Sequence, residues 1–196
     1  MVILPSCPFP SIYWLSLAAN QEEVKVDVLE NYPKQTYRNR YDILGPNGRQ
    51  TLTIPVNRPS GVKTPISEIQ IAYGSWVNEH LGAIRSAYGK SAFFDHFFYE
   101  IEALYQSKPQ LLIDFNSQSL NIVKRVILPE TKLSVIEENV AFSASDLRLN
   151  FEPAFLVSDF KSYPQVFSDR FEFQNNLSVL DLVFNMGPRG KEYIDY

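Results

Sequence analysis

The densest group of polar side chains lies in segment 35–40, which contains Gln35, Tyr37, Arg38, Asn39 and Arg40. Two nearby guanidinium groups can bind a phosphate or carboxylate through paired hydrogen bonds. An amide and a phenol beside them can orient the rest of a ligand. We therefore predict that this segment forms one wall of a substrate-binding site. The alternative is a solvated strand face whose arginines form local salt bridges, for instance to Asp42.

His80 is the candidate for catalysis, because a general base or acid near neutral pH is most often a histidine. It lies four residues after Trp76 and three after Val77, at the edge of the apolar face of an expected helix. We predict that His80 and Trp76 form a second wall of the site. The alternative is a half-buried histidine bonded to a carbonyl group. His96 is expected on the solvent side of its helix.

Four other positions carry weaker signals. Cys7 has no identifiable neighbouring base, so a small buried residue is favoured over a nucleophile. Asp114 and Asn116 could bind a ligand, although helix capping explains Asp114 well. Asn185, near the end of the last helix, could approach a ligand, although a helix C-terminus also accounts for it.

Several familiar signatures are missing from the sequence. It has no Gly-x-Gly-x-x-Gly, no phosphate-binding loop and no Gly-x-Ser-x-Gly elbow. With two histidines and one cysteine, no Cys/His cluster has metal-ligand spacing, so we expect no metal site. The sequence does not indicate a cofactor or an oligomeric state.

Composition limits the partners and the compartment. The net charge of −4 gives no footprint for nucleic acid, and a single cysteine fits a reducing compartment. Pro5, Pro8 and Pro10 interrupt the apolar N-terminal stretch, which argues against a signal peptide. The sequence contains no run of about 20 apolar residues, so we predict no membrane span. We expect a cytoplasmic protein.

The elements that would position these residues follow from periodicity. Strands are expected at 2–4, 24–29, 66–71 and 132–137. A β-hairpin is expected from 32–43 and 49–56 around Gly45-Pro46-Asn47-Gly48. Alternation in its first arm would place Arg38 and Arg40 on one face.

Helices are expected at 11–19, 75–88, 91–106 and 111–128, the last broken and recapped at Asp114. A final helix starts at a capping box of Ser178 and Asp181 and stops at Gly187-Pro188. Segment 140–161 should be irregular and 163–167 extended. We predict a single domain over residues 1–196, of α/β or α+β class, with a mixed sheet, a β-hairpin and helices packed on the sheet.

Several of these segments resemble the WbqC-like protein family, in its Bacteroides-type branch. They run in family order from Leu4 to Pro188 and comprise 34–40, 52–56, 66–71, 76–88 with Phe93-Phe94, 114–116, 163–167 and 176–188. The chain departs from the family pattern at Leu4 to Phe9, where many members have Gln-Pro and aromatics. It also departs at Leu29-Glu30, where many have an acidic pair.

The resemblance implies a bacterial cytoplasmic protein of O-antigen or other surface-polysaccharide biosynthesis. It implies a transferase that moves a small group, such as an aminoacyl or acyl group, to a sugar or nucleotide sugar. Arg38 and Arg40 would hold a phosphate or carboxylate, Tyr37 and Asn39 would orient the ligand, and His80 would be the base. The helix that carries Asn185 would form the third wall.

The alternative function is a non-catalytic ligand-binding or assembly component of a polysaccharide pathway, because no nucleophile–base pair is visible. The opening order of strand, turn, helix and strand is also similar to nucleotidylyltransferase-like folds, although the turn lacks their histidines.

Overall fold

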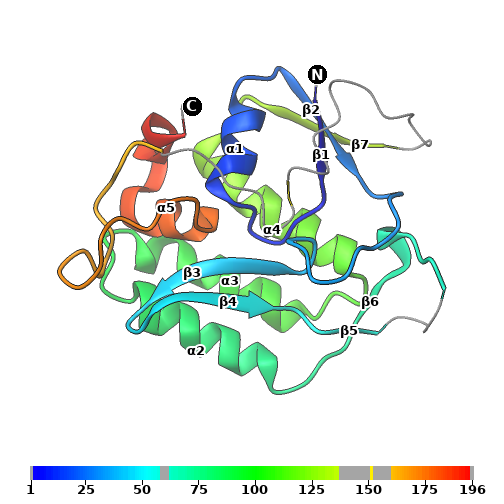
Figure 1. The fold of residues 1–196 in the computed structure, drawn as a ribbon, viewed down its shortest axis with the longest axis horizontal. Helices are drawn as coiled ribbons and strands as arrows, with labels where there is room; N and C mark the ends of the chain where they lie inside the picture. Colours follow the sequence, from blue (N-terminus) through cyan, green and yellow to red (C-terminus); the bar gives the residue numbers. More distant parts are fainter. Residues whose placement is uncertain (1, 58–61, 137–150, 152–159, 195–196) are drawn as a thin grey trace.

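The chain begins with a parallel strand–helix–strand unit. Strand β1 (Val2–Pro5) leads through helix α1 (Ile12–Ala19) to strand β2 (Glu23–Asp27), and β7 (Lys132–Val135) adds to β2. The three strands form a parallel sheet in the order β1-β2-β7, with Val24 opposite Leu133. The structure, a computed structural model, describes residues 2–57, 62–136, 151 and 160–194 (Figure 1).

Two small antiparallel sheets lie beside this unit. Strands β3 (Arg40–Gly45) and β4 (Gly48–Thr53) form the expected hairpin, and β5 (Val56–Asn57) pairs with β6 (Gln70–Ile71). Gly48 has φ +102°, a conformation that a residue without Cβ adopts at little cost. The expected α/β class is therefore confirmed, but parallel and antiparallel strands are divided among separate sheets.

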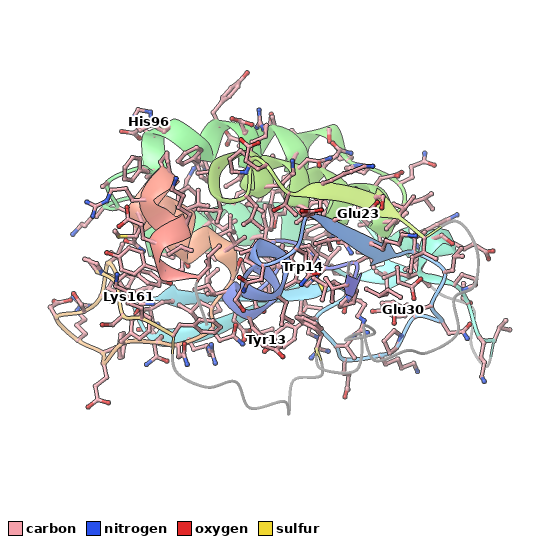
Figure 2. All side chains as sticks on the ribbon, turned by 90° about the horizontal axis from the view of Figure 1, so that it is seen from above. Tyr13, Trp14, Glu23, Glu30, His96 and Lys161 are labelled. Carbon is pink, nitrogen blue, oxygen red and sulfur yellow. The ribbon has the colours of Figure 1, made fainter. Side chains whose placement is uncertain are left out.

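The helices follow the apolar period of the sequence. They are α2 (Trp76–Tyr88), α3 (Phe94–Ser107), α4 (Leu112–Ile127) and α5 (Val179–Met186). Helix α2 packs against β3 and α3, and α4 packs against α3 and α5 (Figure 1). Trp14 lies inside the molecule, whereas His96 is at the outer surface of the helices, as expected (Figure 2). None of the described helices is long and apolar enough to cross a bilayer.

The first arm of the hairpin is shorter than predicted, because segment 33–39 forms turns and only Arg40 begins the strand. Gln35 has φ +60°, Thr36 Oγ1 donates to the Pro33 carbonyl (3.3 Å), and the Arg38 amide donates to Thr36 Oγ1 (3.4 Å). These local hydrogen bonds compete with a strand ladder. The prediction that Arg38 and Arg40 share a strand face was therefore wrong.

Other helices and strands also differ from the prediction. Helix α4 is continuous, so the predicted break at Asp114 was wrong. Residues 66–71 contain a 3-10 helix (Ile66–Glu68) before the short β6.

Ser178 Oγ caps Leu180 N of α5 (3.2 Å), but the Asp181 side chain turns inward to Tyr163 and Gln165. After α5 the chain continues as a 3-10 helix (Gly187–Tyr193). Most of segment 140–161 lies outside the described residues.

Candidate functional site

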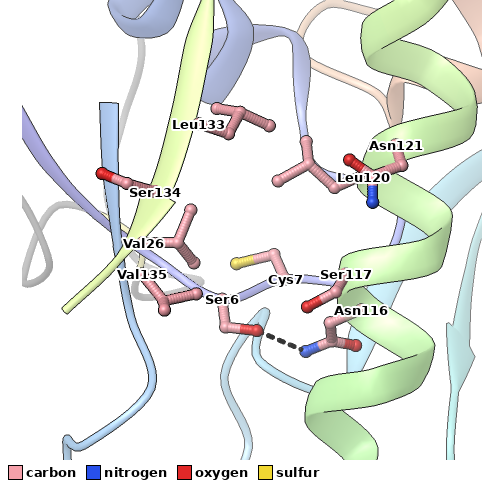
Figure 3. Close-up of a pocket in the computed structure, with 10 residues that line it drawn as sticks. All are labelled: Ser6, Cys7, Val26, Asn116, Ser117, Leu120, Asn121, Leu133, Ser134 and Val135. Carbon is pink, nitrogen blue, oxygen red and sulfur yellow. Dashed lines mark hydrogen bonds between the residues drawn. The ribbon is translucent and has the colours of Figure 1, made fainter. Parts of the chain in front are cut away.

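A cavity of about 440 Å³ lies between the parallel sheet and helix α4 (Figure 3). This is within the usual size range of small-molecule sites. We call it the Cys7 pocket, and it is lined by Ser6, Cys7, Val26, Asn116, Ser117, Leu120, Asn121, Leu133, Ser134 and Val135.

The pocket is assembled from elements that are distant in sequence. Ser6 and Cys7 follow the carboxyl end of β1, the position at which open α/β sheets commonly bind ligands. Asn116 holds this loop to α4, because its Nδ2 donates to Ser6 Oγ (3.1 Å) and to the Arg38 carbonyl (3.0 Å). Its Oδ1 accepts no hydrogen bond from the described part of the chain. The Ser6 and Cys7 loop is therefore held against α4 by a buried amide.

The thiol of Cys7 is the titratable group of the pocket lining. Burial raises the pKa of Cys7 to about 12, while the positive charge of Arg38 lowers it and the carboxylate of Glu30 raises it further. The side chain is 4% exposed. A thiol with this pKa is protonated at neutral pH and is a weak nucleophile. The expectation of a small buried residue is confirmed.

Arg38 is buried behind the pocket and paired with a carboxylate. Its Nε and Nη2 atoms lie 3.0 Å from the two carboxylate oxygens of Glu30, and Nη1 donates to the Phe151 carbonyl (3.4 Å). The guanidinium fork therefore binds a residue of the same chain, and the Arg38 side chain is absent from the pocket lining.

The other polar residues of segment 35–40 point in different directions. Asn39 Nδ2 donates to the Ile54 carbonyl (2.8 Å), and Tyr37 OH donates to Asp42 Oδ2 (3.1 Å). Gln35 is exposed. Tyr37 and Arg40 line a hollow of only about 10 Å³ on the other side of Cys7. The segment does not present its side chains to one common cavity.

His80 lies in an aromatic cluster. Its Nδ1 is 3.2 Å from Tyr105 OH and 3.5 Å from Tyr41 OH, and these two hydroxyls are hydrogen-bonded to each other. The ring centroids of Trp76 and His80 are 4.9 Å apart, and the two rings are arranged edge to face. Burial lowers the pKa of His80 to about 4, and a hydrogen bond to the Thr53 backbone acts in the opposite direction. At neutral pH the imidazole is uncharged.

The family was identified by comparison with known proteins. The model of the WbqC-like protein family matches residues 9–149. The chain belongs to this family. No curated protein and no solved structure matches the chain. The matched range contains Arg38, His80 and Asn116, whereas segments 163–167 and 176–188 lie beyond it.

The elements that carry the three predicted walls of a site in this WbqC-like protein, β3, α2 and α5, pack against one another, but the predicted side chains form separate local contacts. Asn185 Nδ2 donates to the Asp181 carbonyl within α5 (2.8 Å), Trp76 and His80 are in the aromatic cluster, and segment 35–40 is divided as described. None of the eight predicted site residues lines the Cys7 pocket. Their roles in substrate binding and catalysis stay predictions.

Sequence reasoning missed most of the pocket lining. Ser117 and Asn121 are polar residues beside Leu120 on amphipathic α4, and Ser134 lies on an edge strand. A usable signal was the position of Ser6 and Cys7 directly after a buried first strand. Within the described residues, no three His, Cys, Asp or Glu side chains are grouped as metal ligands would be.

Proposed function

We propose that this protein binds a sugar or nucleotide sugar in the Cys7 pocket and transfers a small group to it. The group is an acyl or aminoacyl unit, and the pathway is surface-polysaccharide or O-antigen biosynthesis. Membership of the WbqC-like family suggests a role related to polysaccharide biosynthesis. The observation that carries the proposal is the chemistry of the pocket lining.

The lining combines hydrogen-bonding groups with aliphatic surface. Ser117, Asn121 and Ser134 carry hydroxyl and amide groups that both donate and accept, as sugar hydroxyls require. Val26, Leu120 and Leu133 offer apolar surface for the C–H face of a sugar ring. Neutral groups of both kinds around a cavity of about 440 Å³ suit one sugar unit.

In the proposed reaction, a hydroxyl or amino group of the bound sugar attacks the carbonyl carbon of an activated acyl or aminoacyl donor. The new bond forms to that carbon, the bond to the leaving group breaks, and the proton of the attacking group passes to the leaving group. The pocket contributes by holding the acceptor in place, which replaces a bimolecular encounter with an oriented one.

A second candidate is a non-catalytic sugar-binding component of the same pathway. It is favoured by the side chains of the described lining, because none of them exchanges a proton near neutral pH. Cys7 is the titratable side chain among the ten lining residues, and burial raises its pKa to about 12. The described lining therefore offers no group that exchanges a proton near neutral pH.

The test uses the full chain with sugars, nucleotide sugars, and acyl or aminoacyl thioesters, and detects acylated sugar by mass spectrometry. Ser117→Phe fills the pocket from α4, and Gln118→Phe places the same ring on the exposed neighbouring position. We expect product with the wild type and Gln118→Phe and none with Ser117→Phe. Sugar binding without product selects the second candidate. Absence of sugar binding contradicts both.

A further inference from the structure

The charges around the Cys7 pocket bear on which kind of sugar it accepts. Resting on the proposed function, we infer that the pocket takes an uncharged sugar unit, as a free sugar, glycoside or glycan end, and makes no site for a nucleotide diphosphate. The first observation is that, in the part of the chain that the structure describes, none of the ten residues lining the pocket is Lys, Arg, His, Asp or Glu. A diphosphate needs cationic side chains or free backbone amides.

The N-terminus of α1, the helix that follows the Ser6 and Cys7 loop, is already occupied by the protein itself. The loop through Ser6 and Cys7 leads into α1, and in many parallel sheets the helix after the first strand binds phosphate with its first amides. Here the amide of Ile12 donates to the Leu177 carbonyl (3.0 Å), that of Tyr13 to Asn176 Oδ1 (2.9 Å), and that of Trp14 to Ser11 Oγ (3.4 Å). Segment 176–177 thus takes the place that a phosphate would need.

Arg38 and Arg49, two described arginines of the neighbouring turn segment and hairpin, already form hydrogen bonds within the chain. Arg38 is paired with Glu30 through two hydrogen bonds. Arg49 donates to the carbonyls of Asn175 (2.6 Å) and Asn176 (3.1 Å).

Arg40 has a buried Nε without a hydrogen-bond partner in the described chain. It lines the hollow of about 10 Å³, which has room for about one water molecule. The carboxylate of Asp42 lines the same hollow and would repel an anion. The described surroundings of Cys7 therefore favour a neutral ligand.

The experiment measures binding of methyl glycosides of hexoses and N-acetylhexosamines, of UDP, and of UDP-N-acetylglucosamine to the full chain. Saturation-transfer NMR detects binding and calorimetry gives affinities. The wild type is compared with Ser117→Phe and Gln118→Phe. We expect at least one glycoside to bind the wild type and Gln118→Phe but not Ser117→Phe. Its affinity should change less than about twofold between about 50 mM and 500 mM salt, because no charge is involved.

UDP should neither bind nor displace the glycoside, and UDP-N-acetylglucosamine should bind no more tightly than its methyl glycoside. The inference is overturned, and the proposed function kept, if UDP binds in a way that Ser117→Phe abolishes. A nucleotide sugar that binds more than about tenfold tighter than the glycoside overturns it equally, because charge-assisted contacts give gains of that order. If no sugar of either class binds, the proposed function itself fails.

Discussion

Asp181 and His80 are titratable side chains whose pKa values are shifted by the fold toward the uncharged form. Asp181 is fully buried at the start of α5, where Tyr163 OH and Gln165 Nε2 donate to its Oδ2 at 2.7 and 2.9 Å. Burial raises the pKa of Asp181 to about 6, although these hydrogen bonds lower it. His80 shows the same effect for a base, since burial lowers its pKa. Desolvation disfavours the charged form in both cases.

We predict that Asp181→Asn removes a pH dependence of stability. The folded-state pKa of about 6 exceeds the ordinary 3.8, so the protonated carboxyl stabilises the fold below pH 3.8. This contribution is lost as the pH rises through 6. The amide keeps the acceptor for Tyr163 and Gln165 and cannot ionise. In urea unfolding, the variant should gain about 3 kcal/mol over the wild type between about pH 4 and pH 7.

The control is Asp169→Asn, because the Asp169 side chain is 73% exposed. Its stability relative to the wild type should not change over this pH range. A difference between Asp181→Asn and the wild type that is constant with pH would contradict the prediction.

We predict the opposite pH dependence for His80. Its folded-state pKa of about 4 is below the ordinary 6.5, so its contribution is fully present above pH 6.5 and is lost as the pH falls through 4. His80→Gln keeps an acceptor for Tyr105 OH and cannot become charged. The wild type should lose about 3 kcal/mol relative to this variant between about pH 7 and pH 4.

Product formation by His80→Gln separates a structural role from a catalytic one. We expect it to be retained, because His80 is outside the Cys7 pocket. Loss of product with unchanged sugar binding would instead support the base role predicted from the sequence. The exposed His96→Gln serves as the control for both measurements.

At the scale of elements, the Arg38–Glu30 pair joins the turn segment before β3 to the chain that leaves β2. Nε and Nη2 of Arg38 each donate to one carboxylate oxygen of Glu30. The Arg38 side chain is 2% exposed and the Glu30 side chain 13%. A pair of this kind is costly to break from one side, because the remaining charge stays buried. The pair thus stabilises the contact between this turn segment and the chain that leaves β2.

We predict that Arg38→Met lowers the free energy of unfolding by about 3–5 kcal/mol, since it removes the guanidinium that binds both carboxylate oxygens of Glu30. Arg40→Met is the matched comparison and should cost less than about 1 kcal/mol, because Arg40 forms no ion pair among the described residues. The double variant Arg38→Met/Glu30→Leu should recover part of the loss. Equal effects of the two single substitutions, measured by urea unfolding, would show that the pair is not the cause.

At the scale of the whole molecule, the Cys7 pocket exists only when the β1 loop, the parallel sheet and α4 are packed together (Figure 3). Cys7 is the single cysteine of the chain and therefore reports on this assembly. Its accessibility and its thiolate population both depend on elements far away in sequence.

We predict that iodoacetamide labels native Cys7 at least about 100-fold more slowly than the urea-unfolded chain at the same pH. The reason is that burial raises the pKa of the thiol from 9.0 to about 12 and so reduces the thiolate fraction. Mass spectrometry of the labelled chain gives the rates. A control with Gln118→Cys and Cys7→Ala places the thiol at an exposed position, where labelling should be fast. Equal rates for Cys7 and this control would rule out the buried thiol.

Local patterns in the sequence determined much of the secondary structure. The three- and four-residue spacing of apolar residues predicted α2, α3 and α4 to within a few residues, and Gly45-Pro46-Asn47-Gly48 predicted the hairpin turn. Such patterns act over one or two turns of chain, so a single sequence is enough to recognise them. The turns of segment 33–39 escaped prediction, because hydrogen bonds of the Thr36 side chain override the alternation of polar and apolar residues.

Only the tertiary structure shows which side chains surround each candidate site residue. The sequence showed two arginines close together but could not show that Glu30 pairs with Arg38 and leaves Arg40 without a carboxylate partner in the described chain. It showed His80 on an apolar helix but not the hydroxyls of Tyr41 and Tyr105 beside it. It also gave no sign that β7 pairs with β2 and thereby closes the Cys7 pocket. Ion-pair partners, burial and cavities depend on contacts between residues that are distant in sequence, which local spacing cannot specify.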